Sequence, residues 1–165
     1  MTREERVDKQ KLEESLKYMH FNRFMMVRYL SAAYFFVNAA WALVAFSYQS
    51  WTLYIPLVMV VLNLLSSMEI AGKLQTKTTD APKTTFYFLV QLTLNLLLGI
   101  ICFTPLAASV FPFVSAKNAR AIITMILLIG IFGAIMVLNR LQAVKTNSDK
   151  YYKVISAFKK NHIKN

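Results

Sequence analysis

Four long apolar stretches constrain this chain more than any other feature, because none of them contains Asp, Glu, Lys, Arg or His. They cover approximately residues 29–47, 51–68, 86–103 and 121–138. The hydrocarbon core of a bilayer is about 30 Å thick, and roughly 20 apolar residues of helix are needed to cross it. Each stretch comes close to this length, so the sequence predicts an integral membrane protein with four transmembrane helices.

The composition leaves little room for a separate soluble domain. The chain is 56% hydrophobic and 16% charged, and its polar residues gather at the two ends and in short connections. We therefore expect one membrane domain that comprises residues 1–165. The predicted fold is an all-α, four-transmembrane-helix bundle with a short amphipathic cytoplasmic helix at each terminus.

The basic residues are distributed unevenly between alternate connections. All but two of the 19 lysines and arginines precede the first stretch, follow the last one, or lie in the second connection. The exceptions are Lys117 and Arg120, in the third connection. The positive-inside rule then places both termini in the cytoplasm, and the plasma membrane is the expected location. The net charge of +11 is explained by attraction to the anionic inner leaflet, so we expect no nucleic-acid partner.

Both terminal segments are predicted to be helical and to lie at the cytoplasmic face. Residues 1–28 are predicted to form a polar lead helix. We interpret it as an interfacial entry to the first span, and the less favoured alternative is a docking helix for a cytoplasmic partner. In residues 147–162 apolar side chains recur at helical spacing, as in a basic amphipathic helix on an anionic membrane surface. The lysines expected to contact lipid there are Lys150, Lys153, Lys159 and Lys160.

A second group of candidate residues consists of amides and small residues inside the spans. The predicted helix-contact residues are Asn38, Ala42, Asn63, Gln91, Asn95, Gly130 and Ala134. Small residues let helix backbones approach, and amides can form hydrogen bonds between helices. The alternative for the amides is a polar path for a lipid headgroup or a small solute, which we regard as less favoured. Whether the Gly130 and Ala134 surface faces this chain or a partner is open at this point.

Groups suited to catalysis or metal binding are missing from the spans. The histidines, His20 and His162, are outside them, and Cys102 is the single cysteine. We therefore expect no catalytic, cofactor-binding or metal-binding residues and no enzymatic activity. Glu69 is four residues before Lys73, and a surface ion pair is preferred over a proton-carrying role for the glutamate.

The apolar segment 105–113 contains two prolines and is too short to cross a membrane. It could lie on the outer membrane surface, cap the bundle or form a site for an external partner. A short interfacial segment is the commonest of these arrangements, and the sequence leaves the choice open.

These features favour a non-enzymatic accessory or regulatory membrane subunit. It would bind the transmembrane helices of a larger membrane protein complex, such as a sensor kinase, a transporter or an envelope assembly. One alternative is a small oligomeric transporter or flippase-like protein that uses the intramembrane amide stripe. Another is an immunity protein against a membrane-active peptide. Expected partners are membrane lipids and either a larger membrane protein or further copies of this chain.

Overall fold

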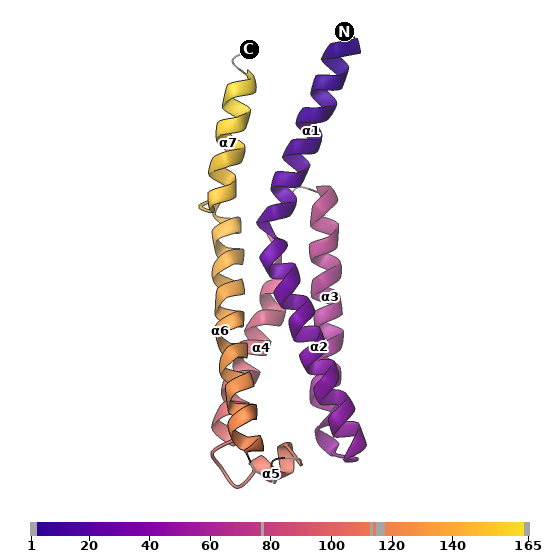
Figure 1. Cartoon of the computed structure of the whole chain (residues 1–165), viewed down its shortest axis with the longest axis vertical. Coiled ribbons are helices and arrows are strands. Elements are labelled where there is room, and N and C mark those ends of the chain that lie inside the picture. Colours follow the sequence, from indigo (N-terminus) through magenta and orange to yellow (C-terminus); the bar gives the residue numbers. More distant parts are fainter. Residues whose placement is uncertain (1–2, 77, 113, 115–117, 164–165) are drawn as a thin grey trace.

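The structure is a computed structural model, and it describes residues 3–76, 78–112, 114 and 118–163. These residues form helices and connecting turns, without a β-strand among them. Figure 1 shows an elongated molecule in which α1 and α7 extend from the same end of a group of longer helices. The elements are α1 (Arg3–Arg23), α2 (Met25–Ser47), a 3₁₀ turn (Trp51–Leu53), α3 (Tyr54–Thr76), α4 (Pro82–Ile101), α5 (Ala107–Val110), α6 (Ala119–Lys145) and α7 (Lys150–Ile163).

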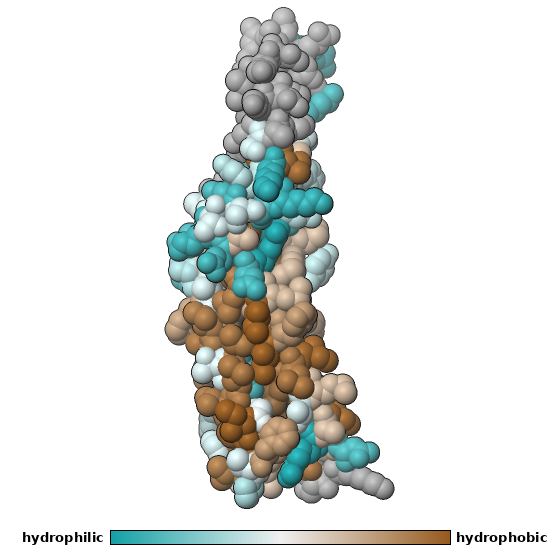
Figure 2. Space-filling view, turned by 90° about the vertical axis from the view of Figure 1, so that its left-hand side faces the viewer, coloured by the Kyte–Doolittle hydropathy of each residue, from teal (hydrophilic) through white to brown (hydrophobic). Residues whose placement is uncertain are grey.

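Helices α2, α3, α4 and α6 carry the four apolar stretches. Within the described residues, four helical segments are long and apolar enough to cross a membrane, as in a multi-pass membrane protein. The helices are longer than the apolar stretches: α2 begins at Met25, and α6 continues to Lys145. The reason is that Arg, Lys and Gln are good helix formers, so the helices continue into polar sequence. In Figure 2 hydrophobic side chains gather around the lower part of the molecule, with hydrophilic residues above them.

The four long helices pack in a closed order. Helix α2 packs on α3, α3 on α4, α4 on α6, and α6 returns to α2. The larger core includes Val27 and Tyr34 from α2, Phe88 from α4 and Val137 from α6. We call the end from which α1 and α7 extend the basic end, since it carries Arg23, Arg28, Lys73, Lys83 and Arg140, and we call the opposite one the far end.

Two helices end in the same type of C-cap. At the end of α2, Gln49 adopts a left-handed conformation (φ 50°), and Ser50 N donates to Ala45 O over 3.0 Å. At the end of α6, Asn147 does the same (φ 53°), and Ser148 N donates to Ala143 O over 3.0 Å. This hydrogen bond satisfies a terminal carbonyl and reverses or redirects the chain within a few residues. The first cap closes the α2–α3 hairpin, and the second sets the break between α6 and α7.

Residues 105–112 pack on the far end of α2, α4 and α6. Ala107, Val110 and Phe111 are buried, and the Phe111 ring lies 5.6 Å from the ring of Trp41 on α2. Val110 and Phe111 belong to a small core with residues of α4 and α6. The segment therefore packs as a cap on the helices, which is one of the three arrangements that the sequence left open, because its apolar side chains find partners on three helices. Phe113 lies outside the described residues.

The position of the two terminal helices on a membrane surface stays a prediction, and the structure shows how these helices contact each other and the rest of the chain. In Figure 1, α1 and α7 run along the long axis of the molecule, and α7 continues approximately in the direction of α6. Helices α1 and α7 contact each other, and Ile155 on α7 is buried. Lys150 and Lys153 are exposed, while the side chains of Lys159 and Lys160 lie outside the described part of the chain. Ile155 is therefore covered by the protein itself, whereas Tyr151 and Val154 on the same helix are exposed.

Candidate functional site

Three of the predicted amides form a hydrogen-bonded chain between α2 and α4. Asn38 Nδ2 donates to Gln91 Oε1 over 3.0 Å and to Tyr34 O over 2.9 Å. Gln91 Nε2 donates to Asn95 Oδ1 over 3.0 Å. The three amide side chains are buried, at 2%, 3% and 5% exposure. The spacing of Gln91 and Asn95, four residues apart on α4, aligns both on the face that meets α2.

Tyr87 connects the fourth amide to this chain. Asn63 Nδ2, on α3, donates to Tyr87 Oη over 2.7 Å and to Ser31 O over 3.0 Å. Tyr87 Oη lies 3.2 Å from Gln91 Oε1 and donates to it. Sequence reasoning missed Tyr87, although it precedes Gln91 by four residues and so shares its helical face. The resulting polar network, which comprises Tyr34, Asn38, Asn63, Tyr87, Gln91 and Asn95, joins α2, α3 and α4.

The small residues of α6 face this network. Tyr34 Oη donates a hydrogen bond to Gly130 O, and a Cβ atom at Gly130 would lie 2.5 Å from Asn95 Nδ2. A Cβ atom at Gly133 would lie 3.0 Å from Tyr34 Oη, and Ala134 is fully buried. The structure therefore places the Gly130 and Ala134 surface against α2 and α4 of the same chain. Ala42 is buried on α2.

The polar network is closed within the chain. Each of its four amides forms a hydrogen bond with another residue of the protein. Among the described residues, the buried side-chain polar atoms without a partner are Ser31 Oγ, Trp41 Nε1 and Ser66 Oγ, and no amide is among them. Polar groups at membrane depth are costly unless satisfied, so this pairing lets the amides hold helices together.

A second polar cluster, which we call the clamp, lies at the basic end. Arg23, the last residue of α1, is 1% exposed, and the side chain of Asp149 is fully buried. Arg23 Nη2 donates to Asp149 Oδ1 over 2.6 Å, and Arg23 Nε lies 3.1 and 3.2 Å from the two carboxylate oxygens. Arg23 Nη2 also donates to Val144 O and Asn147 Oδ1, over 3.0 and 2.8 Å. The guanidinium thus binds the C-cap of α6 and the residue that precedes α7.

Arg140 adds a second cation to the clamp. Its Nε donates to Arg23 O over 3.1 Å, and its Nη2 is 3.9 Å from Asp149 Oδ2. The two guanidinium groups also lie over aromatic rings of α7, Arg23 over Tyr152 at 5.4 Å and Arg140 over Tyr151 at 5.3 Å. The carboxylate therefore accepts charge-assisted hydrogen bonds from Arg23, and the two guanidinium groups make cation–π contacts with α7. Together these contacts fix the α1–α2 junction to the α6–α7 junction.

Glu69 has a different partner from the one expected. Its carboxylate accepts hydrogen bonds from Thr84 N at 2.7 Å, Thr84 Oγ1 at 2.8 Å and Lys83 N at 3.3 Å. Lys73 instead donates to Thr78 Oγ1 over 3.0 Å. The predicted Glu69–Lys73 pair was thus wrong, because the unpaired N–H groups and the positive dipole end of α4 offer the carboxylate a better environment.

In the part of the chain that the structure describes, no three His, Cys, Asp or Glu side chains lie close enough together to hold a metal ion. Cys102 is buried as a free thiol at the far end. The arrangement offers two sets of polar contacts that fix helices to one another, the polar network and the clamp. The chain matches no protein-family model, no curated protein and no solved structure.

Proposed function

We propose that the protein is a non-enzymatic accessory or regulatory membrane subunit that binds transmembrane helices of a larger membrane protein. The observation that carries this proposal is the closed polar network. The groups that could have handled a solute or a proton inside the membrane bond to one another instead. What remains for contact with other molecules is the outer surface of the helices, which includes a crevice between α2 and α3, and the basic end.

The same observation counts against a transport role for the amide stripe. A polar path needs donors and acceptors that can exchange partners as a solute passes, and a cavity to hold the solute. Gln91 donates to Asn95 and accepts from Asn38 and Tyr87, and it is 3% exposed. Moving a solute along this stripe would break several buried hydrogen bonds at once.

Helix α6 offers the best surface for a partner helix. It is the most apolar of the four spans, with a mean hydropathy of 2.8, and the least buried, at 17% of its most apolar segment. Leu128, Ile129 and Phe132 on α6 are 61%, 67% and 66% exposed. Its inward face is already occupied by Tyr34 and Asn95. A partner would therefore pack on the outward face, where contacts are governed by shape and dispersion.

The proposal includes an orientation, with four spans, both termini in the cytoplasm and the protein in the plasma membrane. The distribution of basic residues supports it. Cysteines introduced at Ser50 and Thr79, in a variant that lacks Cys102, provide the test. An impermeant thiol reagent applied to intact cells should label position 50 and spare position 79, and the reverse pattern would overturn the orientation.

Purification in a mild detergent, followed by mass spectrometry, tests the accessory role. We expect one larger membrane protein to co-purify in a fixed stoichiometry and to be lost when Phe132 is replaced by Ala. The exposed Val61→Ala variant on α3 is the matched control and should retain the partner. A pure homo-oligomer that carries out vesicle flux, with flux abolished by Gln91→Leu, would contradict the proposal and favour transport.

A further inference from the structure

A crevice of about 370 Å³ opens between α2 and α3 near the basic end. Its volume is within the range of about 300–1,000 Å³ that is typical of ligand pockets. The residues that line it are Arg28, Ser31, Ala32, Phe35, Phe36, Asn63, Leu64, Ser67 and Ile70. Ala32, Phe36 and Leu64 are exposed, so the crevice opens toward the surface that faces lipid.

One buried polar atom in this crevice has no partner. Ser31 is 3% exposed, and its Oγ forms no hydrogen bond within the described residues. The neighbouring polar groups are already bonded, since Ser67 Oγ donates to Asn63 Oδ1 over 3.3 Å and Asn63 Nδ2 donates to Ser31 O. A buried hydroxyl without a partner is costly in an apolar environment. Ser31 Oγ is thus a donor without a partner in the wall of the crevice.

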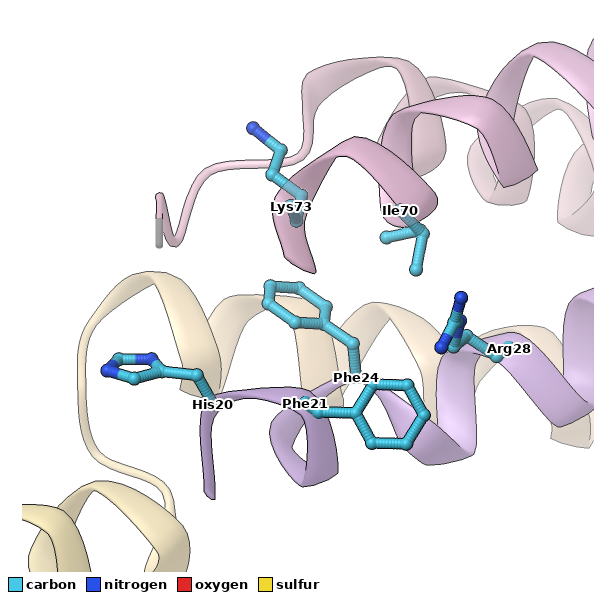
Figure 3. Close-up of a pocket in the computed structure, with 6 residues that line it drawn as sticks. All are labelled: His20, Phe21, Phe24, Arg28, Ile70 and Lys73. Atoms are coloured by element: carbon cyan, nitrogen blue, oxygen red, sulfur yellow. The ribbon is translucent and has the colours of Figure 1, made fainter. Parts of the chain in front are cut away.

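One residue of the crevice lining, Arg28, is positively charged. Arg28 lines both the crevice and a smaller pocket beside it, which Lys73 and His20 also line (Figure 3). The Arg28 guanidinium lies over the Phe21 ring at 4.8 Å. The ion pairs in the described part of the chain involve Arg23, Arg140 and Lys145, and none of them involves Arg28 or Lys73. These cations therefore keep their charge available to an anion outside the chain.

We propose that this crevice binds an anionic phospholipid from the membrane leaflet at the basic end. The phosphate binds Arg28, which presents a planar fork of donors. An acyl chain lies against Phe35, Phe36 and Leu64, and Ser31 Oγ donates to an ester carbonyl. Basic pockets between transmembrane helices at the cytoplasmic side are suited to anionic headgroups in this way.

The shape and charge of the crevice favour a lipid over a helix of a partner protein. A helix with its side chains is about 10–12 Å across, and it would need a long groove lined by small residues. Here the walls carry two bulky side chains, Phe35 and Phe36, and the one basic residue of the lining is Arg28. An apolar chain with a negative headgroup matches both features.

The test uses the full-length protein in phosphatidylcholine nanodiscs with phosphatidylglycerol as the anionic lipid. Native mass spectrometry measures how many phosphatidylglycerol molecules remain bound as its fraction is varied. We expect one tightly bound molecule, with affinity about tenfold lower in Arg28→Gln, the loss typical of one charge-assisted hydrogen bond. Ala32→Trp, which fills the open side of the crevice, should lower the occupancy as well.

Two controls separate the crevice from general surface attraction. Lys83→Gln removes an exposed charge at the same end that no ion pair within the described residues neutralises, at a position that does not line the crevice, and should leave the affinity unchanged. Arg28→Lys keeps the charge and should retain part of the affinity. A melting curve of Arg28→Gln shows whether that variant is folded, so that its loss of affinity can be assigned to the missing charge. Soluble glycerol phosphate should not displace the lipid, since it lacks the acyl chain.

Three results would overturn the proposal. Equal losses in Arg28→Gln and Lys83→Gln would mean that only surface charge attracts the lipid. Retention of phosphatidylcholine and phosphatidylglycerol alike would mean that the crevice does not recognise the phosphate. A protein partner lost from Ala32→Trp, with lipid binding unchanged, would assign the crevice to a helix. Because the purified chain alone is measured, these results are independent of whether the accessory role is correct.

Discussion

Replacing Asp149 by Asn should destabilise the protein far more than any change to an exposed ion pair. The substitution keeps the shape of the side chain and removes its charge, so the buried Arg23 guanidinium loses its counter-ion. Asp149 contacts Arg23 at 2.6, 3.1 and 3.2 Å, and both side chains are almost fully buried. Breaking such a pair from one side costs about 3–5 kcal/mol. For a chain of this size, 3 kcal/mol corresponds to a fall in Tm of roughly 6–12 °C.

The assay is thermal unfolding of the full chain in one mild detergent, beside limited proteolysis of the α6–α7 junction. Asp80→Asn is the control, because Asp80 and Lys145 form a 3.3 Å pair whose side chains are 59% and 64% exposed. An exposed pair of this kind contributes less than about 1 kcal/mol. We also expect Arg23→Met with Asp149→Leu to be less destabilising than the sum of the single changes. The clamp would be refuted as a stabilising contact if Asp149→Asn and Asp80→Asn had equal effects.

Three further predictions concern the helix contacts. Gly130→Leu should lower the free energy of unfolding by about 1–3 kcal/mol or prevent folding, since its Cβ would meet Asn95 Nδ2. Gly72→Ala is the control and should be tolerated, because a Cβ atom there meets open space. Equal melting curves of the two variants would contradict this. Glu69→Gln should cost about 1 kcal/mol by weakening the cap on α4, and a wild-type melt would argue against that cap. Gln91→Leu should lower the free energy of unfolding by about 1–3 kcal/mol, because it leaves buried hydrogen-bond partners unpaired. Any cellular function should then fall only in proportion to the amount of folded protein. Loss of function with an unchanged melting curve would contradict a purely structural role.

The transmembrane helices could be predicted from the sequence because the exclusion of charge from long stretches is a local property. Their ends could not be placed as well, because helices such as α6 continue beyond the apolar residues to Lys145. The inward face of α4 was also visible, since Gln91 and Asn95 share one side of a helix. Which helix that side meets depends on the packing order of the four helices, which the periodicity of one segment does not specify.

The clamp and the Glu69 cap were missed for a different physical reason. Arg23 and Asp149 are 126 residues apart, so no local spacing rule brings them together. Glu69 followed a familiar i, i+4 rule toward Lys73, but a tertiary contact with α4 prevailed. A signal was present in the sequence, because α4 begins with Ala81 and Pro82 and has no capping side chain of its own. A helix start without a cap calls for an acceptor from elsewhere in the chain.

Photo-cross-linking from the outward face of α6 tests the central claim most directly. A photoreactive amino acid is placed at Phe132 on α6, and a matched control at Val61 on α3, which are 66% and 56% exposed. In intact membranes the account predicts a single protein adduct of defined mass from position 132 and only lipid adducts from position 61. Lipid adducts alone from both positions, or adducts of the chain with itself at position 132, would contradict the accessory-subunit proposal.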